Sequence, residues 1–223
     1  MLTKNIKFKN FYIRTNISKV KKDFQKLKKI NSELFNSLSQ RYSYSFSKKI
    51  IQKYKNFFKL RIIGMGGSVL GTKAIFSFLK HKIKKNFLFI DDLNSDTINK
   101  KESRVLNLVV SKSGNTLETV SNSNILINKS DKNIFITENN NSYLNNLAHT
   151  LQAEIVHHNN YIGGRYSVLS EVGMLPAELV GLNPNKFKQL NYLIKNKKFI
   201  DMLIRNVASI INLIKKKKIS LSY

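Results

Sequence analysis

The sequence has no cysteine among its 223 residues. This absence excludes a disulfide framework, and it also excludes thiolate chemistry for metal binding or nucleophilic attack. No apolar run comes near the roughly 20 residues that a transmembrane helix requires. The N-terminal stretch MLTKNIKFKN contains no continuous apolar segment and no small-residue cleavage site, which argues against a secretory signal. We therefore expect a cytoplasmic protein with no membrane partner.

Acidic residues are scarce: 13 Asp and Glu stand against 39 Lys and Arg, so the formal net charge is +26. Clustered cations bind nucleic acid through its phosphates. Here the lysines are spread over most of the chain, without a zinc-finger or RNA-binding signature, and the abundance of Lys, Asn and Ile is typical of an AT-rich genome. We therefore expect no nucleic-acid partner. A positive field would instead steer a phosphorylated metabolite into a cleft.

Five short apolar runs from residue 59 onward alternate with segments of helical character. The predicted strands are KLRIIG, NFLFI, RVLNLVV, KNIFIT and AEIVHH. Strands that alternate with helices imply crossover connections, which predicts an α/β fold with a parallel five-stranded sheet. Ligands bind at the carboxyl ends of the strands in such sheets, so the loops at those ends are the candidate site.

Helical patterns flank this region on both sides. Residues 17–38 carry apolar side chains at steps of three and four, which predicts one amphipathic surface helix. A second apolar stripe runs from Phe199 to Ile214, and the final ISLSY alternates like the start of a strand, so we expect a fragment of a longer protein. The predicted divisions are an N-terminal helical segment, a first α/β domain, and connecting helices with the start of a truncated second domain, over residues 1–50, 51–185 and 186–223.

Glycines follow the first predicted strand in GMGGSVLG, residues 64–71. Glycine lets the backbone approach a ligand closely, and the following helix offers free N–H groups to an anion. The stretch does not fit the dinucleotide fingerprint, which needs glycine where Val69 stands, or the P-loop, because Thr72 precedes Lys73. A plain strand-to-helix turn is the alternative for this stretch alone.

Three hydroxyl side chains gather after the third predicted strand, in SKSGNTLET. Ser111, Ser113 and Thr116 supply hydroxyl donors, and Gly114 permits a tight bend. The side chain of Lys112 can contribute charge or point to solvent. The loop opens a helix, whose N-terminal amides favour a phosphate dianion. A helix cap is the alternative, but a cap needs one hydroxyl and this loop offers three.

The third candidate stretch is GGRYS, in which Arg165 follows two glycines. A guanidinium stays charged in a protein, so it can provide fixed positive charge for a developing oxyanion. A surface arginine in a turn is the plain alternative.

GMGGSVLG, SKSGNTLET and GGRYSVLSEVGMLPA, in this order and at strand ends, resemble the glucose-6-phosphate isomerase family of the sugar isomerase superfamily. The resemblance covers roughly residues 55–185. It implies a sugar isomerase domain, which is a three-layer sandwich with helices on both faces of the sheet. It also implies isomerisation of a hexose 6-phosphate in glycolysis and gluconeogenesis by a homodimer that requires no cofactor.

The resemblance assigns substrate binding to residues of the first two loops. These residues are Gly67, Ser68, Ser111, Lys112, Ser113, Thr116 and Glu118. The hydroxyls and the Lys112 backbone amide would hold the phosphate, and the Gly67–Ser68 pair would lie along the sugar. Arg165 would be the catalytic residue that stabilises the enediolate. Leu117 departs from the glutamine of classical members, which leaves the substrate preference open.

By the same resemblance, a carboxylate with a pKa near the working pH moves a proton between C2 and C1 through a cis-enediolate. In the family the base glutamate, a histidine and a late lysine lie downstream, so we expect them beyond Tyr223. The chain is then an incomplete form that binds sugar phosphate weakly without turnover. The alternatives are a non-catalytic phosphosugar-binding module and lysine-mediated nucleic-acid binding, whose affinity would fall steeply with salt.

The histidines do not indicate a metal site. His157 and His158 are adjacent, so on a strand they point to opposite faces. Glu154 lies nearby in the sequence, but no third ligand has a usable spacing. His81 and His149 are isolated and are expected on the surface.

Overall fold

The computed structural model describes residues 15–30, 33–93, 104–189 and 195–216. The chain divides into two compact units, one of residues 33–188 and one that combines residues 1–32 with 189–223. The predicted strand in ISLSY lies outside the described residues. The predicted domain boundaries stay predictions, and each unit is described below by itself.

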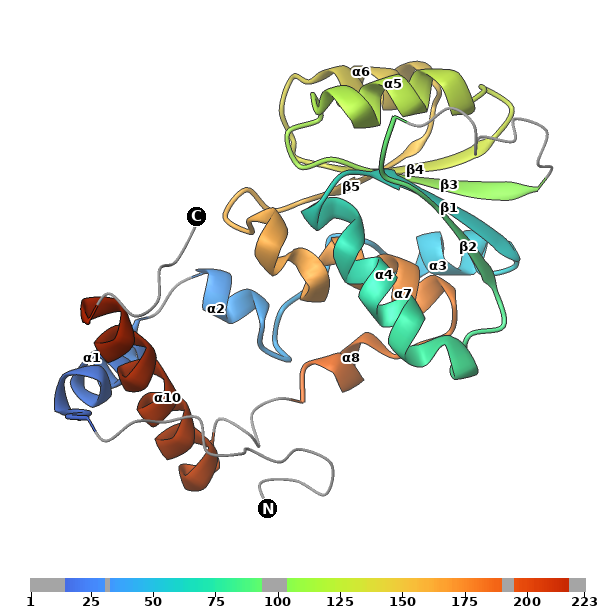
Figure 1. The fold of residues 1–223 in the computed structure, drawn as a ribbon. Helices are drawn as coiled ribbons and strands as arrows, with labels where there is room; N and C mark the ends of the chain where they lie inside the picture. Colours follow the sequence, from blue (N-terminus) through green and yellow to red (C-terminus); the bar gives the residue numbers. More distant parts are fainter. Residues whose placement is uncertain (1–14, 31–32, 94–103, 190–194, 217–223) are drawn as a thin grey trace. The chain divides into compact units, whose positions relative to one another are not determined.

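The unit of residues 33–188 is built on the parallel five-stranded sheet that the sequence predicts (Figure 1). Its strands are β1 (Lys59–Gly64), β2 (Asn86–Ile90), β3 (Val105–Val110), β4 (Lys132–Thr137) and β5 (Glu154–His157). Their order across the sheet is β2-β1-β3-β4-β5, and every neighbouring pair is parallel. All carboxyl ends therefore lie at one edge of the sheet.

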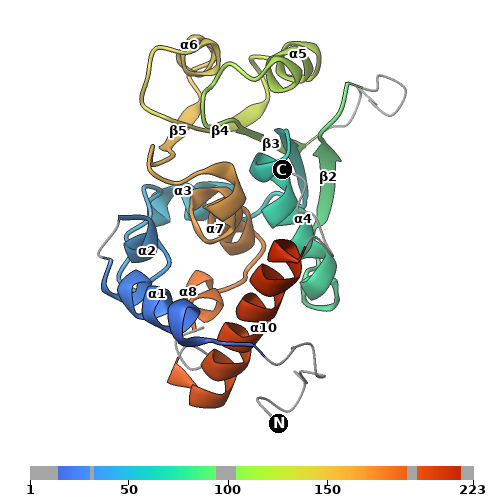
Figure 2. The same ribbon diagram turned by 60° about the vertical axis from the view of Figure 1, so that its left-hand side comes forward.

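Helices cover both faces of this sheet, as Figure 2 shows from a second direction. On one face lie α3 (Lys48–Tyr54), α4 (Gly67–Leu79) and α7 (Glu171–Leu179), and on the other lie α5 (Leu117–Leu126) and α6 (Tyr143–Thr150). The short helices among the described residues of the unit are α2 (Glu33–Ser37), η1 (Lys80–Lys82), η3 (Gly164–Leu169) and α8 (Pro184–Phe187). The predicted α/β fold with helices on both faces is confirmed.

Strand residues alternate between two apolar cores, because successive side chains on a strand point to opposite faces. Ile62 and Leu108 pack into the core that α4 and α7 cover, whereas Ile63 and Val109 pack into the core beneath α5 and α6. Both faces are buried, so β1 and β3 are largely apolar, as is typical of parallel sheets, although Arg61 and Asn107 are buried within them.

The other unit contains α1 (Ser18–Lys29) and α10 (Lys197–Lys215), which contact each other. Helix α10 confirms the helix expected from the stripe between Phe199 and Ile214, and the Asn196 side chain caps it by accepting from the Phe199 N–H (3.1 Å). Among the described residues, no helix is long and apolar enough to span a membrane.

The prediction of one helix over residues 17–38 is wrong. Helix α1 ends at Lys29, Ile30 has an extended backbone with ψ 115°, and α2 is a separate short helix. The β-branched Ile30 loses rotamer freedom in a helix, and the Asn and Ser that follow it in the sequence favour helix ends. These local preferences outweigh the apolar period that continues past residue 30.

Candidate functional site

The strand order places a topological switch point between β1 and β3. The chain leaves β1 through α4 toward β2, but it leaves β3 through α5 toward β4, so the two connections run in opposite directions from neighbouring strands. Open α/β sheets bind ligands at such a switch point, outside the carboxyl ends of the strands. The loops that follow β1 and β3 contain the first two of the three predicted stretches.

Residues 111–116, named here the hydroxyl loop, are held tightly at the end of β3. The Ser111 N–H donates to the Ile136 carbonyl (3.1 Å), and the Ser111 hydroxyl lies 3.0 Å from that of Thr116. The Gly114 N–H donates to Ser111 Oγ (3.2 Å). Gly114 has φ +69°, and a Cβ there would lie 2.1 Å from Ser142 Oγ, so only glycine fits this bend.

The hydroxyl loop leads directly into the N-terminus of α5. Thr116 precedes the helix with an extended backbone, and its side chain makes no capping bond to the first turn. First-turn amides have no partner inside a helix, and the positive end of the helix dipole lies there. Ser113 is exposed in the loop that precedes the helix, and Glu118 lies partly buried in the first turn. This arrangement of amides and hydroxyls suits an anion such as a phosphate.

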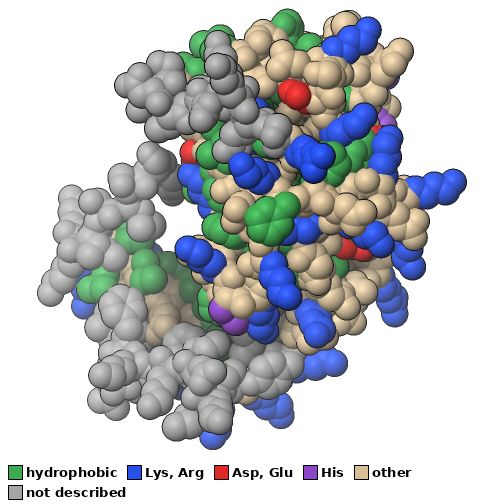
Figure 3. Space-filling view, turned by 90° about the vertical axis from the view of Figure 1, so that its right-hand side faces the viewer, with side chains coloured by type: hydrophobic (Ala, Val, Ile, Leu, Met, Phe, Trp, Pro, Cys, Tyr) green, Lys and Arg blue, Asp and Glu red, His purple; other side chains and the backbone are tan. Residues whose placement is uncertain are grey.

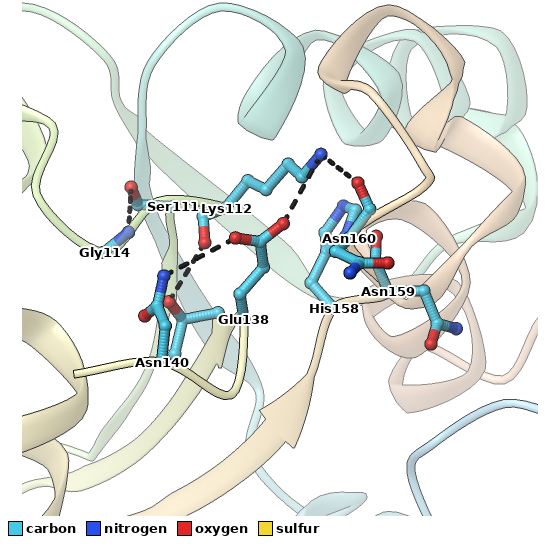
Figure 4. Close-up of polar contacts among 9 residues, drawn as sticks. Ser111, Lys112, Gly114, Glu138, Asn140, His158, Asn159 and Asn160 are labelled. Atoms are coloured by element: carbon cyan, nitrogen blue, oxygen red, sulfur yellow. Dashed lines mark hydrogen bonds and ion pairs between the residues drawn. The ribbon is translucent and has the colours of Figure 1, made fainter. Parts of the chain in front are cut away.

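The Lys112 side chain neither offers its charge to a ligand in the loop nor points freely to solvent, the two alternatives that the sequence left open. Figure 4 shows it reaching past Glu138 to Asn160. Its ammonium lies 3.4 Å from Glu138 Oε1 and donates to the Asn160 carbonyl. Only the Lys112 backbone N–H is therefore suited to face a ligand in the loop. Sequence reasoning missed Glu138, which directly follows a predicted strand, and Asn160, which lies two residues beyond another.

The first and third predicted stretches meet through their backbones. Gly66 has φ +54° and turns the chain from β1 into α4, which begins at Gly67. A Cβ on Gly67 would lie 2.5 Å from the carbonyl carbon of Gly164. The Ser167 hydroxyl lies 3.1 Å from the Gly67 carbonyl oxygen and 2.8 Å from that of Gly164. Glycine is required at position 67 because the two segments touch.

The predicted site residues therefore fall on adjoining segments of one sheet edge. Arg165 is exposed in η3, directly after Gly164, and the partly buried Ser68 follows Gly67 in α4. The β1 end also touches the β3 end, since a Cβ on Gly64 would lie 2.7 Å from the Val110 carbonyl oxygen. Val110 directly precedes the hydroxyl loop.

The four histidines differ in exposure. His81 and His149 are exposed, as expected, and His157 is exposed at the end of β5. His158 is buried, its Nδ1 lies 3.0 Å from the Asn159 carbonyl, and burial lowers its pKa. The described residues include no group of three His, Cys, Asp or Glu that could hold a metal ion.

A second polar network joins Tyr42 and Ser45, which precede the sheet, to Glu171 of α7. Glu171 is fully buried and accepts hydrogen bonds from the Tyr42 hydroxyl (2.9 Å) and the Ser45 N–H (3.0 Å). The Lys188 ammonium lies 4.4 Å from the Tyr42 ring centroid and 4.5 Å from that of Tyr44. Burial lowers the pKa of Lys188 to about 8, although Glu171 acts to raise it. Glu171 is thus a structural acceptor in this network.

The family model described as phosphoglucose isomerase matches residues 15–213. The chain belongs to the phosphoglucose isomerase family. Curated relatives named glucose-6-phosphate isomerase include one from Borrelia garinii subsp. bavariensis, 33% identical over 74% of this chain and 36% of the relative. Another, from Acholeplasma laidlawii, is 34% identical over 62% of this chain and 37% of the relative. The chain therefore matches roughly a third of the length of these family members.

Solved structures share the fold of this phosphoglucose isomerase family member at low identity. A hypothetical protein from Thermus thermophilus has a TM-score of 0.62 and 17% identity over 85% of this chain and 50% of its own. A Bacteroides fragilis protein assigned as a phosphosugar isomerase involved in capsule formation has a TM-score of 0.50 and 14% identity, over 81% and 95% respectively. These likenesses concern the fold alone.

Proposed function

We propose that this chain supplies the phosphate-binding and enediolate-stabilising part of a glucose-6-phosphate isomerase. The substrate would be a hexose 6-phosphate, interconverted between its aldose and ketose forms. The observation that carries the proposal is the backbone contact of Gly67 with Gly164, because it brings the Arg165 segment to the switch point beside the hydroxyl loop. Family membership and the relatives' printed names support the same substrate class.

In this proposal the phosphate occupies the hydroxyl loop. The hydroxyls of Ser111, Ser113 and Thr116 donate to its oxygens, together with the Lys112 N–H and the first-turn amides of α5. Hydrogen bonds to an ionised acceptor are worth about 1.5–3 kcal/mol each, more than neutral ones. The hexose then extends along Gly67 and Ser68 toward Arg165.

Arg165 acts on the charge that develops during proton transfer. Removal of the C2 proton places negative charge on the oxygens of the cis-enediolate, and a guanidinium held beside them stabilises that charge in the transition state. The proton returns at C1. We assign the general base, the ring-opening acid and their lysine partner to no residue of this sequence, and we propose that the longer protein represented by the relatives supplies them. The homodimer and the cytoplasmic location stay predictions.

The lysines are less suited to a nucleic-acid role than to steering of an anion. Figure 3 shows Lys and Arg side chains spread over the face drawn, without a single continuous stripe. Two basic side chains near the edge are engaged with carboxylates, Lys112 with Glu138 and Lys73 with Asp91 (2.6 Å).

Calorimetric titration with glucose 6-phosphate, paired with a coupled isomerase assay, tests the proposal. We expect weak saturable binding and no turnover by these 223 residues. Turnover that is lost in Arg165→Ala would overturn the assignment of an incomplete form. Absence of any phosphosugar binding would overturn the site itself. Binding without turnover even in the longer protein would favour the non-catalytic phosphosugar-binding module.

A further inference from the structure

One lysine side chain links the ends of three neighbouring strands. Lys112 follows β3, Glu138 follows β4 and Asn160 follows β5. The Lys112 ammonium contacts the Glu138 carboxylate (3.4 Å) and donates to the Asn160 backbone carbonyl, as the dashed lines in Figure 4 show. We call these three residues the Lys112 bridge.

Glu138 holds both the backbone and the side chain of Lys112. Its N–H donates to the Lys112 carbonyl (3.1 Å), and Thr137 Oγ1 donates to the same carbonyl (3.4 Å). The second carboxylate oxygen of Glu138 accepts from Asn140 Nδ2 (3.5 Å). The side chains of Lys112 and Glu138 are 34% and 21% exposed, so solvent screens this pair less than a fully exposed one.

The other end of the bridge continues into the arginine segment. Two residues after Asn160 lies the fully buried Ile162, whose N–H donates to the Asn159 carbonyl (3.1 Å). The chain then passes through Gly163 and Gly164 to Arg165. This connection is short and anchored, so the position of the Asn160 carbonyl constrains where the arginine segment begins.

We propose that the Lys112 bridge is a positioning device that sets the Arg165 segment relative to the hydroxyl loop. The inference rests on the proposed function of this edge. The bridge would act on recognition of the sugar, which Arg165 and its segment would contact, and not on recognition of the phosphate, which the hydroxyl loop holds by itself. Lys112 and Glu138 carry opposite charges, so their pair contributes little net field to a bound anion.

A charge-neutral double variant, Lys112→Met with Glu138→Gln, removes the bridge without changing the net charge. The matched control is Lys53→Met with Glu154→Gln, which removes an ion pair of 2.7 Å between α3 and the amino end of β5 in the same unit. The Lys112→Arg variant is the conservative replacement, because a guanidinium reaches both acceptors. Dissociation constants for inorganic phosphate and for glucose 6-phosphate are measured by NMR titration of each full chain.

We expect the double variant to bind inorganic phosphate within twofold of the unmodified chain and glucose 6-phosphate at least tenfold more weakly. The control variant should leave both constants within about twofold, and Lys112→Arg should bind glucose 6-phosphate more tightly than the double variant does. An unchanged ratio of the two constants, or equal loss of both ligands, would overturn the positioning role. If the unmodified chain binds glucose 6-phosphate no more tightly than inorganic phosphate, the proposed function is refuted, whatever the variants show.

Discussion

Gly67 offers a direct test of the contact between the β1–α4 turn and the arginine segment. A Cβ at this position would lie 2.5, 2.6 and 2.7 Å from the carbonyl carbon, carbonyl oxygen and Cα of Gly164. All three are backbone atoms, so no flexible side chain can move aside. Gly67→Ala must therefore displace one of the two segments.

The size of the effect follows from two opposing contributions. Overpacking of this kind costs typically about 1–3 kcal/mol, and three backbone clashes place Gly67 in the upper part of that range. Alanine returns up to about 1 kcal/mol because it favours a helix more than glycine does. The net loss is about 1–2 kcal/mol, which lowers the melting temperature of a domain of this size by roughly 3–6 °C.

Gly163→Ala is the matched control, because it adds the same methyl group to the neighbouring segment. Gly163 has φ −70°, and a Cβ there would meet only Tyr166 Cδ2 at 3.7 Å. Its free energy of unfolding should change by less than about 0.5 kcal/mol. Thermal unfolding followed by circular dichroism measures both variants. Equal melting temperatures for Gly67→Ala and Gly163→Ala would refute the contact.

Two further predictions concern the loop and the buried network. Ser113→Ala should weaken glucose 6-phosphate binding by about 1–3 kcal/mol, because the proposed ligand is charged, and calorimetry measures this loss. The melting temperature should change little, because Ser113 is exposed. The pKa of the buried Lys188 is lowered to about 8, so the Lys188 ammonium loses its proton at a lower pH in the folded chain than in the unfolded chain. Between pH 8 and pH 9.5 the unfolded chain therefore binds more protons, and the free energy of unfolding should rise by about 1.5 kcal/mol. Denaturant titrations should show this slope in the unmodified chain but not in Lys188→Met, and equal slopes would count against it.

The sheet was predictable because its signal is local. Each strand is a short, mostly apolar run bounded by polar or glycine residues, because burial on both faces favours apolar side chains. The candidate loops were predictable once the strands were, because the carboxyl ends of parallel strands lie at one edge of the sheet. The contact between Gly67 and Gly164 could be found only in the structure, because the sequence around either glycine does not indicate which residue it contacts.

The bridge and the buried network could not be predicted, because their partners are distant in sequence. Lys112 reads as a loop lysine until the structure places Glu138 and Asn160 beside it. Tyr42 and Lys188 come from opposite ends of the unit and meet only after the sheet and its helices pack. The end of α1 at Lys29 was missed because the apolar period alone does not mark where a helix stops.

The central claim is that the hydroxyl loop and the arginine segment converge on one phosphorylated hexose. An NMR titration of the isotopically labelled chain with glucose 6-phosphate tests it most directly. The account predicts that amides of residues 112–118 and 164–167 shift together with one dissociation constant, and that inorganic phosphate shifts only the first group. Shifts confined to the lysine-rich α1, or a response of 164–167 that saturates independently of the loop, would contradict it.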